Sequence, residues 1–240
     1  MQGIGQSAGK SFAYLLGVYL GDGCVTTMSA KGGRYTYTVF RLNSIDPDFI
    51  EATRAALADL GVERIWVSCH PVKKSSKPNH SLTAKAENLC DEMVFATYAK
   101  TKLPPMKGWT RAEKLAFVAG LMDSEGFVAA NSNTTNRRFY MGFKCCDPWV
   151  PEFRDLLESL GIRTGKFSTE APLRDGYKAP QRFAIKMQSW IDSGAKFRIA
   201  RKQNRVDEWG AAGAYERRAR FPRQAKANLR DFTPNAGASR

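Results

Sequence analysis

The 240-residue sequence has few of the residues on which disulfide and zinc chemistry depend. It contains two histidines, His70 and His80, and five cysteines, none of them in a C-x-x-C spacing. An odd count without that spacing argues against a disulfide framework and against a zinc ribbon, and favours a reducing compartment. Catalysis that needs several imidazoles is disfavoured for the same reason.

Long apolar runs are also missing. No stretch approaches the ~20 consecutive apolar residues that a membrane-spanning helix needs. The first ten residues, MQGIGQSAGK, lack an apolar core of signal-peptide length. We therefore expect an intracellular protein, whose host compartment the sequence does not assign.

The sequence is instead rich in positive charge. It has 37 Lys and Arg against 23 Asp and Glu, a formal net charge of +14, and its pI is near 9.7. A pI this high indicates a polyanionic partner and favours nucleic acid, the alternative being a basic soluble enzyme. Apolar residues make up 43% of the chain, enough for a globular protein of one large domain or two smaller ones.

A nine-residue pattern occurs twice. LLGVYLGDG spans Leu15–Gly23, and VAGLMDSEG spans Val118–Gly126, at an offset of 103. In both copies small residues are four positions apart, and an acid follows the second of them: Gly17, Gly21 and Asp22 in the first copy, Gly120, Ser124 and Glu125 in the second.

A longer repeat surrounds this pattern. DPDFIEATRAALADLGV from Asp46 resembles DPWVPEFRDLLESLGI from Asp147, and both end in a Leu-Gly helix stop. Stretches with strand-like composition are 34–43, 64–69 and 80–86 in the first half and 137–145, 163–169 and 181–187 in the second. A third helix is predicted over 87–100 and over 188–209. The fold class is therefore α+β, with two pseudo-symmetric αββαββα halves. We place the halves at 1–100 and 111–209, a linker at 101–110 and a basic tail at 210–240.

The paired small residues predict how the two pattern helices meet. Residues i and i+4 share one helix face, and small side chains there let two backbones approach closely. Packing the two helices on each other brings Asp22 and Glu125 together at helix C-termini. Two carboxylates ~4 Å apart repel by about 4 kcal/mol at an effective dielectric of 20. A slightly larger separation would reduce this repulsion, and a bound divalent cation would remove it. Carboxylates with unpaired helix-end carbonyls form an oxygen site suited to Mg²⁺.

With these two motifs, the chain resembles the LAGLIDADG homing endonucleases of the single-chain, two-motif kind, over residues 11–209. The resemblance implies that the motif helices form the interface between the halves and that two curved antiparallel sheets form a saddle on duplex DNA. It implies cleavage of both strands across the minor groove at a long pseudo-palindromic target, leaving short 3′ overhangs, by a monomer. Leu20 stands where many members have Asp, whereas the second copy keeps Asp123.

The resemblance also implies the residues of the active sites. Asp22 and Glu125 bind the metal, joined by the backbone carbonyls of Gly21 and Ser124; the metal is Mg²⁺, for which Ca²⁺ or Mn²⁺ could substitute. A basic residue assists near each scissile phosphate, late in each half. The candidates are Lys100 or Lys102 in the first half and Arg201 or Lys202 in the second.

DNA contacts are expected on the polar faces of the strands, because a two-stranded ribbon fits the major groove. Period-two alternation places Tyr35, Tyr37, Val39, Arg41 and Asn43 on one face of the first long strand. The residues expected to contact DNA are Arg34, Tyr35, Tyr37, Arg41, Asn43, Lys73, Lys74, Ser81, Thr83, Lys85, Arg138, Tyr140, Lys144, Arg182 and Lys186.

Two other functions fit the same scaffold. One is an RNA-binding intron maturase, with the host intron RNA as a partner, and the other is a DNA-binding regulator without catalysis. The two intact acids favour cleavage over both. The sequence leaves open the target site, the host and the number of metal ions.

Overall fold

The computed structural model describes residues 6–30, 32–71, 77–131, 138–172 and 178–211. The first half contains, in order, α1 (Gln6–Leu20), β1 (Cys24–Ala30), β2 (Tyr35–Ser44), α2 (Pro47–Asp59), β3 (Ile65–His70), β4 (Asn79–Lys85) and α3 (Glu87–Ala96). The second half contains α4 (Arg111–Ser124), β5 (Gly126–Asn131), β6 (Arg138–Cys145), α5 (Val150–Ser159), β7 (Ser168–Thr169), β8 (Gln181–Ile185), α6 (Met187–Ser193) and α7 (Ala200–Ala211).

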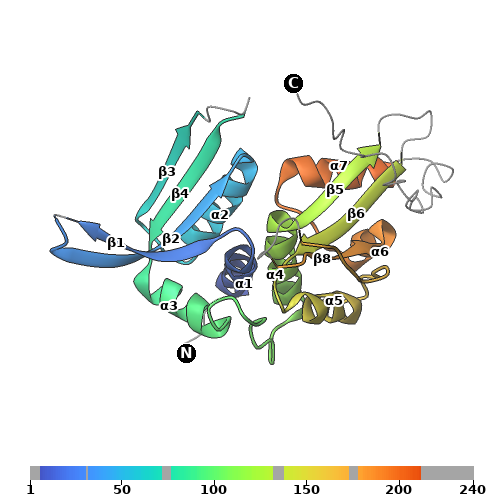
Figure 1. The fold of residues 1–240 in the computed structure, drawn as a ribbon, viewed down its shortest axis with the longest axis horizontal. Helices are drawn as coiled ribbons and strands as arrows, with labels where there is room; N and C mark the ends of the chain where they lie inside the picture. Colours follow the sequence, from blue (N-terminus) through green and yellow to red (C-terminus); the bar gives the residue numbers. More distant parts are fainter. Residues whose placement is uncertain (1–5, 31, 72–76, 132–137, 173–177, 212–240) are drawn as a thin grey trace, which may run out of the picture.

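Each half builds one antiparallel sheet of four strands with the same topology. The strand orders are β1-β2-β4-β3 and β5-β6-β8-β7. The two sheets lie on either side of a central pair of helices, α1 and α4 (Figure 1). The α+β fold class with two halves of matching element order, predicted from the sequence, is confirmed.

Local sequence signals explain where several helices begin and end. Thr110 and Glu113 form a complete capping box at the start of α4. Pro47 occupies the first turn of α2, where its missing N–H costs nothing. The predicted Leu-Gly stops are present: Gly61 and Gly161 follow α2 and α5 with φ of 77° and 79°, a conformation that glycine adopts without strain.

The apolar face of each sheet packs on the second helix of its own half. In the first half, the alternating strand residues Phe40 and Leu42 are buried together with Phe49 of α2. In the second half the core is more aromatic. The rings of Phe143 and Phe153 lie 4.6 Å apart, and those of Phe143 and Phe183 lie 5.7 Å apart. Burying one face of each sheet leaves the opposite, polar face exposed.

Three predicted elements differ in the structure. The helix predicted over 87–100 ends at Ala96, because Tyr98, Ala99 and Lys100 all have positive φ. The helix predicted over 188–209 is two helices, α6 and α7, since Gly194 ends α6 in the left-handed conformation. The strand predicted over 163–169 is reduced to Ser168–Thr169 and one bridge at Thr164.

The structure adds two findings on cysteine and membranes. All five cysteines are free thiols. Within the described ranges, no helix combines the length and apolarity that crossing a membrane requires.

Candidate active site

The two motif helices touch at their glycines. A Cβ on Gly17 would collide with the backbone oxygen of Phe117 and lie 2.8 Å from the nitrogen of Leu121. A Cβ on Gly120 would collide with the backbone oxygen of Tyr14 in the same way. At this crossing, backbone lies directly on backbone, which only glycine permits. The halves therefore meet along α1 and α4.

One turn further on, the acids of the two motifs come together. A Cβ on Gly21 would collide with the Cβ of Ser124 and lie 3.4 Å from the Cγ of Glu125. Asp22 follows Gly21 in the turn after α1, and Glu125 caps the C-terminus of α4. Asp22 is exposed, whereas Glu125 is half-buried. Both acids thus lie at the ends of the paired helices.

The electrostatics of this acid pair are unfavourable to two negative charges. Burial, together with the neighbouring carboxylates of Asp22 and Asp147, raises the pKa of Glu125 to about 7, while Lys100 and Lys202 oppose the shift. Desolvation by the surrounding protein atoms also raises the pKa of Asp22, although Lys202 and Lys100 oppose the shift. Such shifts mark carboxylates that the protein alone does not neutralise.

This chemistry fits a hard divalent cation. Among the described residues, no three His, Cys, Asp or Glu side chains gather into a metal cluster. Mg²⁺ is commonly held by one or two carboxylates together with waters and substrate phosphates, so two acids suffice. Ser124, whose carbonyl is a candidate ligand, lies in the last turn of α4. The Oγ of Ser124 donates a hydrogen bond to Gly120 O at 3.1 Å.

Lys100 reaches the first motif from the end of the first half. Its Nζ donates a hydrogen bond to Gly21 O at 2.9 Å, and it lies 5.2 Å from the ring centre of Tyr19. Its backbone oxygen accepts a hydrogen bond from the indole Nε1 of Trp149 at 3.1 Å. Burial lowers the pKa of Lys100, and the carboxylate of Asp147 is the largest opposing influence. The second half therefore helps to position this lysine.

Lys202 occupies the related place at the second motif, on the first turn of α7. It is buried, and its Nζ donates hydrogen bonds to Met122 O at 2.9 Å and to Asp123 O at 2.5 Å. Burial lowers the pKa of Lys202 to about 8, while Asp123 opposes the shift. A lysine with a lowered pKa beside paired acids is a marker of a functional site.

The other two basic candidates are placed differently. Arg201 lines the hollow that contains Asp22, but it is engaged in a bidentate ion pair with Asp46 of the first half, at 3.1 Å from Nε and 2.8 Å from a terminal nitrogen. Lys102 is exposed and its Nζ lies 4.9 Å from the ring centre of Tyr98. The geometry therefore brings Lys100 and Lys202 to the acids and leaves Lys102 outside.

Each acid lies in a hollow of its own, with an aspartate from the repeated Asp-Pro. Asp22 lines one hollow with Asp46 and Lys202, and Glu125 lines another with Asp147. The sequence predicted both Asp-Pro pairs only as part of the longer repeat, and their place beside the motif acids was missed. Their exact repetition at an offset of 101 was the signal that could have found them.

Asp123, at the sixth position of the second motif, has a structural role. It is buried, its carboxylate accepts hydrogen bonds from the Tyr14 hydroxyl at 3.0 Å and from the backbone nitrogen of Arg198 at 3.1 Å, and burial raises its pKa to about 6. It holds the chain just before α7. Leu20, its counterpart in the first motif, is buried and apolar.

The residues expected to contact DNA in the first half follow the polar face of β2 and β4. Arg41 and Thr83 are direct cross-strand partners, as are Asn43 and Ser81. The remaining described members are Arg34, exposed in the turn before β2; Tyr35, exposed; Tyr37, half-buried; and Lys85, whose Nζ lies 5.1 Å from the ring centre of Tyr37.

This face is not exposed along its whole length. Val39, which the predicted alternation places on it, is fully buried. It lies in the middle of the sheet, with Thr26 and Lys85 as its partners on the two sides.

Trp66 of β3, which sequence reasoning missed, is 53% exposed and is the cross-strand partner of Thr83. An exposed tryptophan next to polar strand residues was a readable signal.

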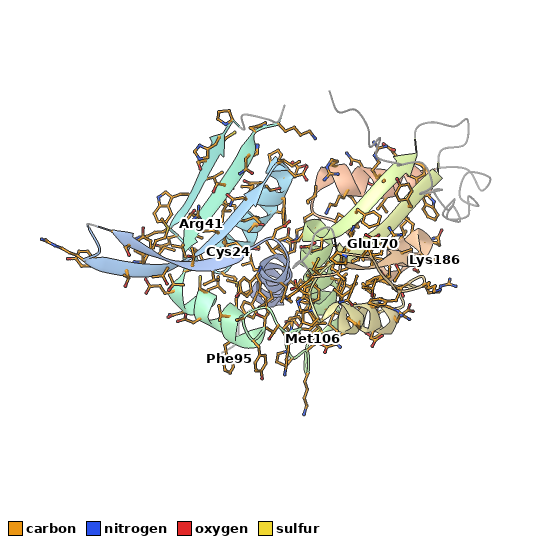
Figure 2. All side chains as sticks on the ribbon, in the orientation of Figure 1. Cys24, Arg41, Phe95, Met106, Glu170 and Lys186 are labelled. Carbon is orange, nitrogen blue, oxygen red and sulfur yellow. The ribbon has the colours of Figure 1, made fainter. Side chains whose placement is uncertain are left out.

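In the second half, Lys144 and Arg182 are direct partners on β6 and β8. Tyr140 is half-buried, with its ring edge-on to Phe127. Lys186 lies beyond the end of β8, at the start of α6 and toward the outer side of the molecule (Figure 2). Lys73, Lys74 and the side chain of Arg138 lie outside the described residues, as do residues 212–240 of the predicted basic tail.

Comparison with known families agrees with the geometry. Residues 9–93 match the family model described as a LAGLIDADG-like domain. No match is found among curated proteins.

Solved structures extend the LAGLIDADG likeness to both halves. A structure of mesophilic variants of the homing endonuclease I-DmoI aligns with a TM-score of 0.54 at 16% identity, covering 78% of this chain and 90% of that one. I-DmoI in complex with DNA and Ca aligns with a TM-score of 0.53 at 16% identity, covering 78% and 88%. At this level of sequence identity, the two structural alignments show a shared fold. The predicted resemblance to single-chain LAGLIDADG homing endonucleases is confirmed.

Proposed function

We propose that the chain is a divalent-metal-dependent endonuclease that cuts double-stranded DNA at a specific, long, pseudo-palindromic target. One observation carries this proposal: the acids of both motifs meet at the ends of two helices packed backbone to backbone. They are flanked by two lysines and by the polar faces of two sheets. I-DmoI, which has the same fold, has been solved in complex with DNA and Ca and in complex with DNA and Mn.

The chain's own residues have separate tasks in this reaction. The carboxylates of Asp22 and Glu125, with the carbonyls of Gly21 and Ser124, would hold the cation. A bound divalent cation stabilises the charge that develops on a phosphodiester and activates water. Lys100 and Lys202, as ammonium groups, would stabilise negative charge near each scissile phosphate. Binding the cation requires Glu125 in its ionised form, which its raised pKa opposes until the cation is present.

The architecture also supports a monomer that reads one half of its target with each half of the chain. We propose residues 1–100 and 111–209 as these two half-units, joined by 101–110, with 210–240 as a basic tail. Because the halves are not identical, the target is an imperfect palindrome. Cleavage leaves short 3′ overhangs, as in the family that the fold represents.

The test is selection of cleaved sites from a randomised duplex library with the full chain and Mg²⁺, with EDTA as the metal-free control. Asp22→Asn and Glu125→Gln should each abolish cutting while DNA affinity stays within about threefold, since the loss is of transition-state charge stabilisation. Glu92→Gln, an exposed acid of α3, is the charge-matched control and should cut normally. Cutting that persists in EDTA would refute the metal dependence, and RNA binding without any DNA cleavage would refute the nuclease.

A further inference from the structure

The polar face of the second sheet carries two cations directly opposite each other. Lys144 of β6 and Arg182 of β8 are cross-strand partners, and alternation along both strands puts their side chains on the face opposite the buried Phe143 and Phe183. Like charges in directly opposed positions destabilise a sheet. A neighbouring negative charge would offset this repulsion between Lys144 and Arg182.

Glu170 lies between them. Its carboxylate is 2.6 Å from Lys144 Nζ and 2.7 Å from the guanidinium of Arg182, one oxygen for each cation. The backbone nitrogen of Glu170 donates to Pro180 O at 2.8 Å, which continues the pairing of β7 with β8 and fixes the position of the acid. These contacts hold the pKa of Glu170 below its usual range, with the hydrogen bond from Lys144 as the largest cause.

The corresponding pair of the first sheet is neutral. The buried partners Leu42 and Leu82 match Phe143 and Phe183, so Asn43 occupies the position of Lys144, and Ser81 occupies that of Arg182. Arg41 lies two residues before Asn43 on β2, and its buried Nε finds no hydrogen-bond partner among the described residues. Figure 2 shows Arg41 and Glu170 on opposite sides of the α1–α4 pair. Within the described residues, one half thus presents two neutral side chains where the other presents two cations that share one acid.

We propose that Glu170 is a specificity-determining residue that acts through Lys144 and Arg182, disfavouring DNA contacts in which these two cations only neutralise phosphates. This inference rests on the proposed recognition of duplex DNA. The acid holds both side chains over the polar face of the sheet, where a groove would present base edges. It also repels a phosphate brought to the same place.

The physical basis is the difference between phosphate and base contacts. Phosphate neutralisation supplies essentially all of the affinity for unrelated DNA and carries no sequence information. Base edges in the major groove offer acceptors for Lys and Arg, and these can be engaged with the carboxylate still in place. Specificity can therefore come from lowering the affinity for unrelated DNA.

Glu170→Gln tests this, because it keeps the shape and removes the charge. Binding of the full chain is measured in EDTA against a duplex selected by binding from a randomised library and against an unrelated duplex of equal length, from low to high salt. For the unrelated duplex we expect about 3- to 10-fold tighter binding and a salt slope steeper by about 0.9. Binding to the selected duplex should change little, so the specificity ratio falls by about 3- to 10-fold.

Two controls separate this role from bulk charge and from sheet stability. Glu92→Gln removes the same charge from α3 and should leave the ratio unchanged. In a Lys144→Met/Arg182→Met background, Glu170→Gln should also leave the ratio unchanged, because its effect acts through the two cations. A merely structural role would lower the thermal midpoint and weaken binding to both duplexes.

The inference is overturned if Glu170→Gln changes both affinities equally, or if it weakens binding only to the selected duplex, which would make Glu170 a direct base contact. A wild-type chain that binds DNA selectively without cutting it refutes the nuclease and leaves this measurement intact. A wild-type nuclease whose Glu170→Gln variant keeps the normal ratio refutes this inference alone.

Discussion

The two halves of the chain share the element order αββαββα, to which the second adds α7, but they surround their motif acids differently. Asp22 lies exposed in a turn, whereas Glu125 ends its helix half-buried, and burial raises its pKa to about 7. Lys100 reaches the first motif from a left-handed turn, and Lys202 reaches the second from the first turn of a helix. The same backbone plan has thus been given two electrostatic environments.

The shared part of the comparison is the helix pair, and the differing part is what surrounds it. Gly17 and Gly120 mirror each other at the crossing, where any side chain meets backbone. Residues outside the crossing are free to differ, since one chain contains both copies and need not serve two identical sites. We infer that packing fixes the axis of pseudo-symmetry, while the sheets and lysines adapt to the two halves of a non-identical target.

The largest effect should come from breaking the crossing. Gly17→Ala and Gly120→Ala should each lower the free energy of unfolding by about 3 kcal/mol or more, because the added Cβ collides with backbone that cannot move aside. Chemical denaturation of each variant measures this. Gly210→Ala is the control: it lies in α7 with only Ile191 Cδ1 nearby, at 3.7 Å, and should be neutral or slightly stabilising. Unequal losses at Gly17 and Gly120 would break the proposed symmetry of the interface.

Substituting the two lysines should have the next largest effect, and each substitution should slow the cutting of a different DNA strand. Lys202→Met and Lys100→Met should each slow cutting by about 10²-fold at one strand and less at the other, because each removes charge stabilisation beside one acid. A duplex target labelled differently on its two strands reports which strand is nicked first. Lys102→Met, which removes an exposed ammonium, is the matched control and should cut normally. If both variants cut the same DNA strand more slowly, the two lysines would serve one active site.

The acids should differ in their dependence on pH. The pKa of Glu125 is raised from 4.5 in the unfolded chain to about 7 in the fold, so between these values the folded protein binds a proton that the unfolded chain has lost. In EDTA, stability should therefore fall as pH rises from about 4.5 to 7, by on the order of 1–3 kcal/mol. Urea unfolding across this range measures the slope.

Glu125→Gln should flatten that slope, and Mg²⁺ should reduce it by favouring the ionised carboxylate. Asp22→Asn should flatten the slope less, because Asp22 is more exposed than Glu125 and keeps part of its hydration. A variant lacking Glu125 that keeps the full slope would place the titrating group elsewhere.

The sequence predicted what depends on local pattern. Both motif helices, the alternation along β2 and β6, and the Leu-Gly stops follow from residue spacing, and so did the pairing of Asp22 with Glu125. The sequence did not predict the features that depend on contacts between residues far apart in the chain. No local signal announces the left-handed turn at Tyr98–Lys100, which is held by Trp149 across the halves, nor the meeting of Glu170 with Lys144.

The smallest effect should come from the ion pair between halves. Arg201 and Asp46 join α7 to the start of α2, whereas Asp147, the repeat of Asp46, forms no ion pair within the described residues. The Arg201 side chain is 53% exposed, so a double-mutant cycle of Asp46→Asn with Arg201→Gln should give a coupling below about 1 kcal/mol that shrinks as salt rises. Asp147→Asn, the control in the other half, should cost no stability through a lost ion pair. A coupling well above that value would mean that this pair, and not only the glycine crossing, sets how the halves dock.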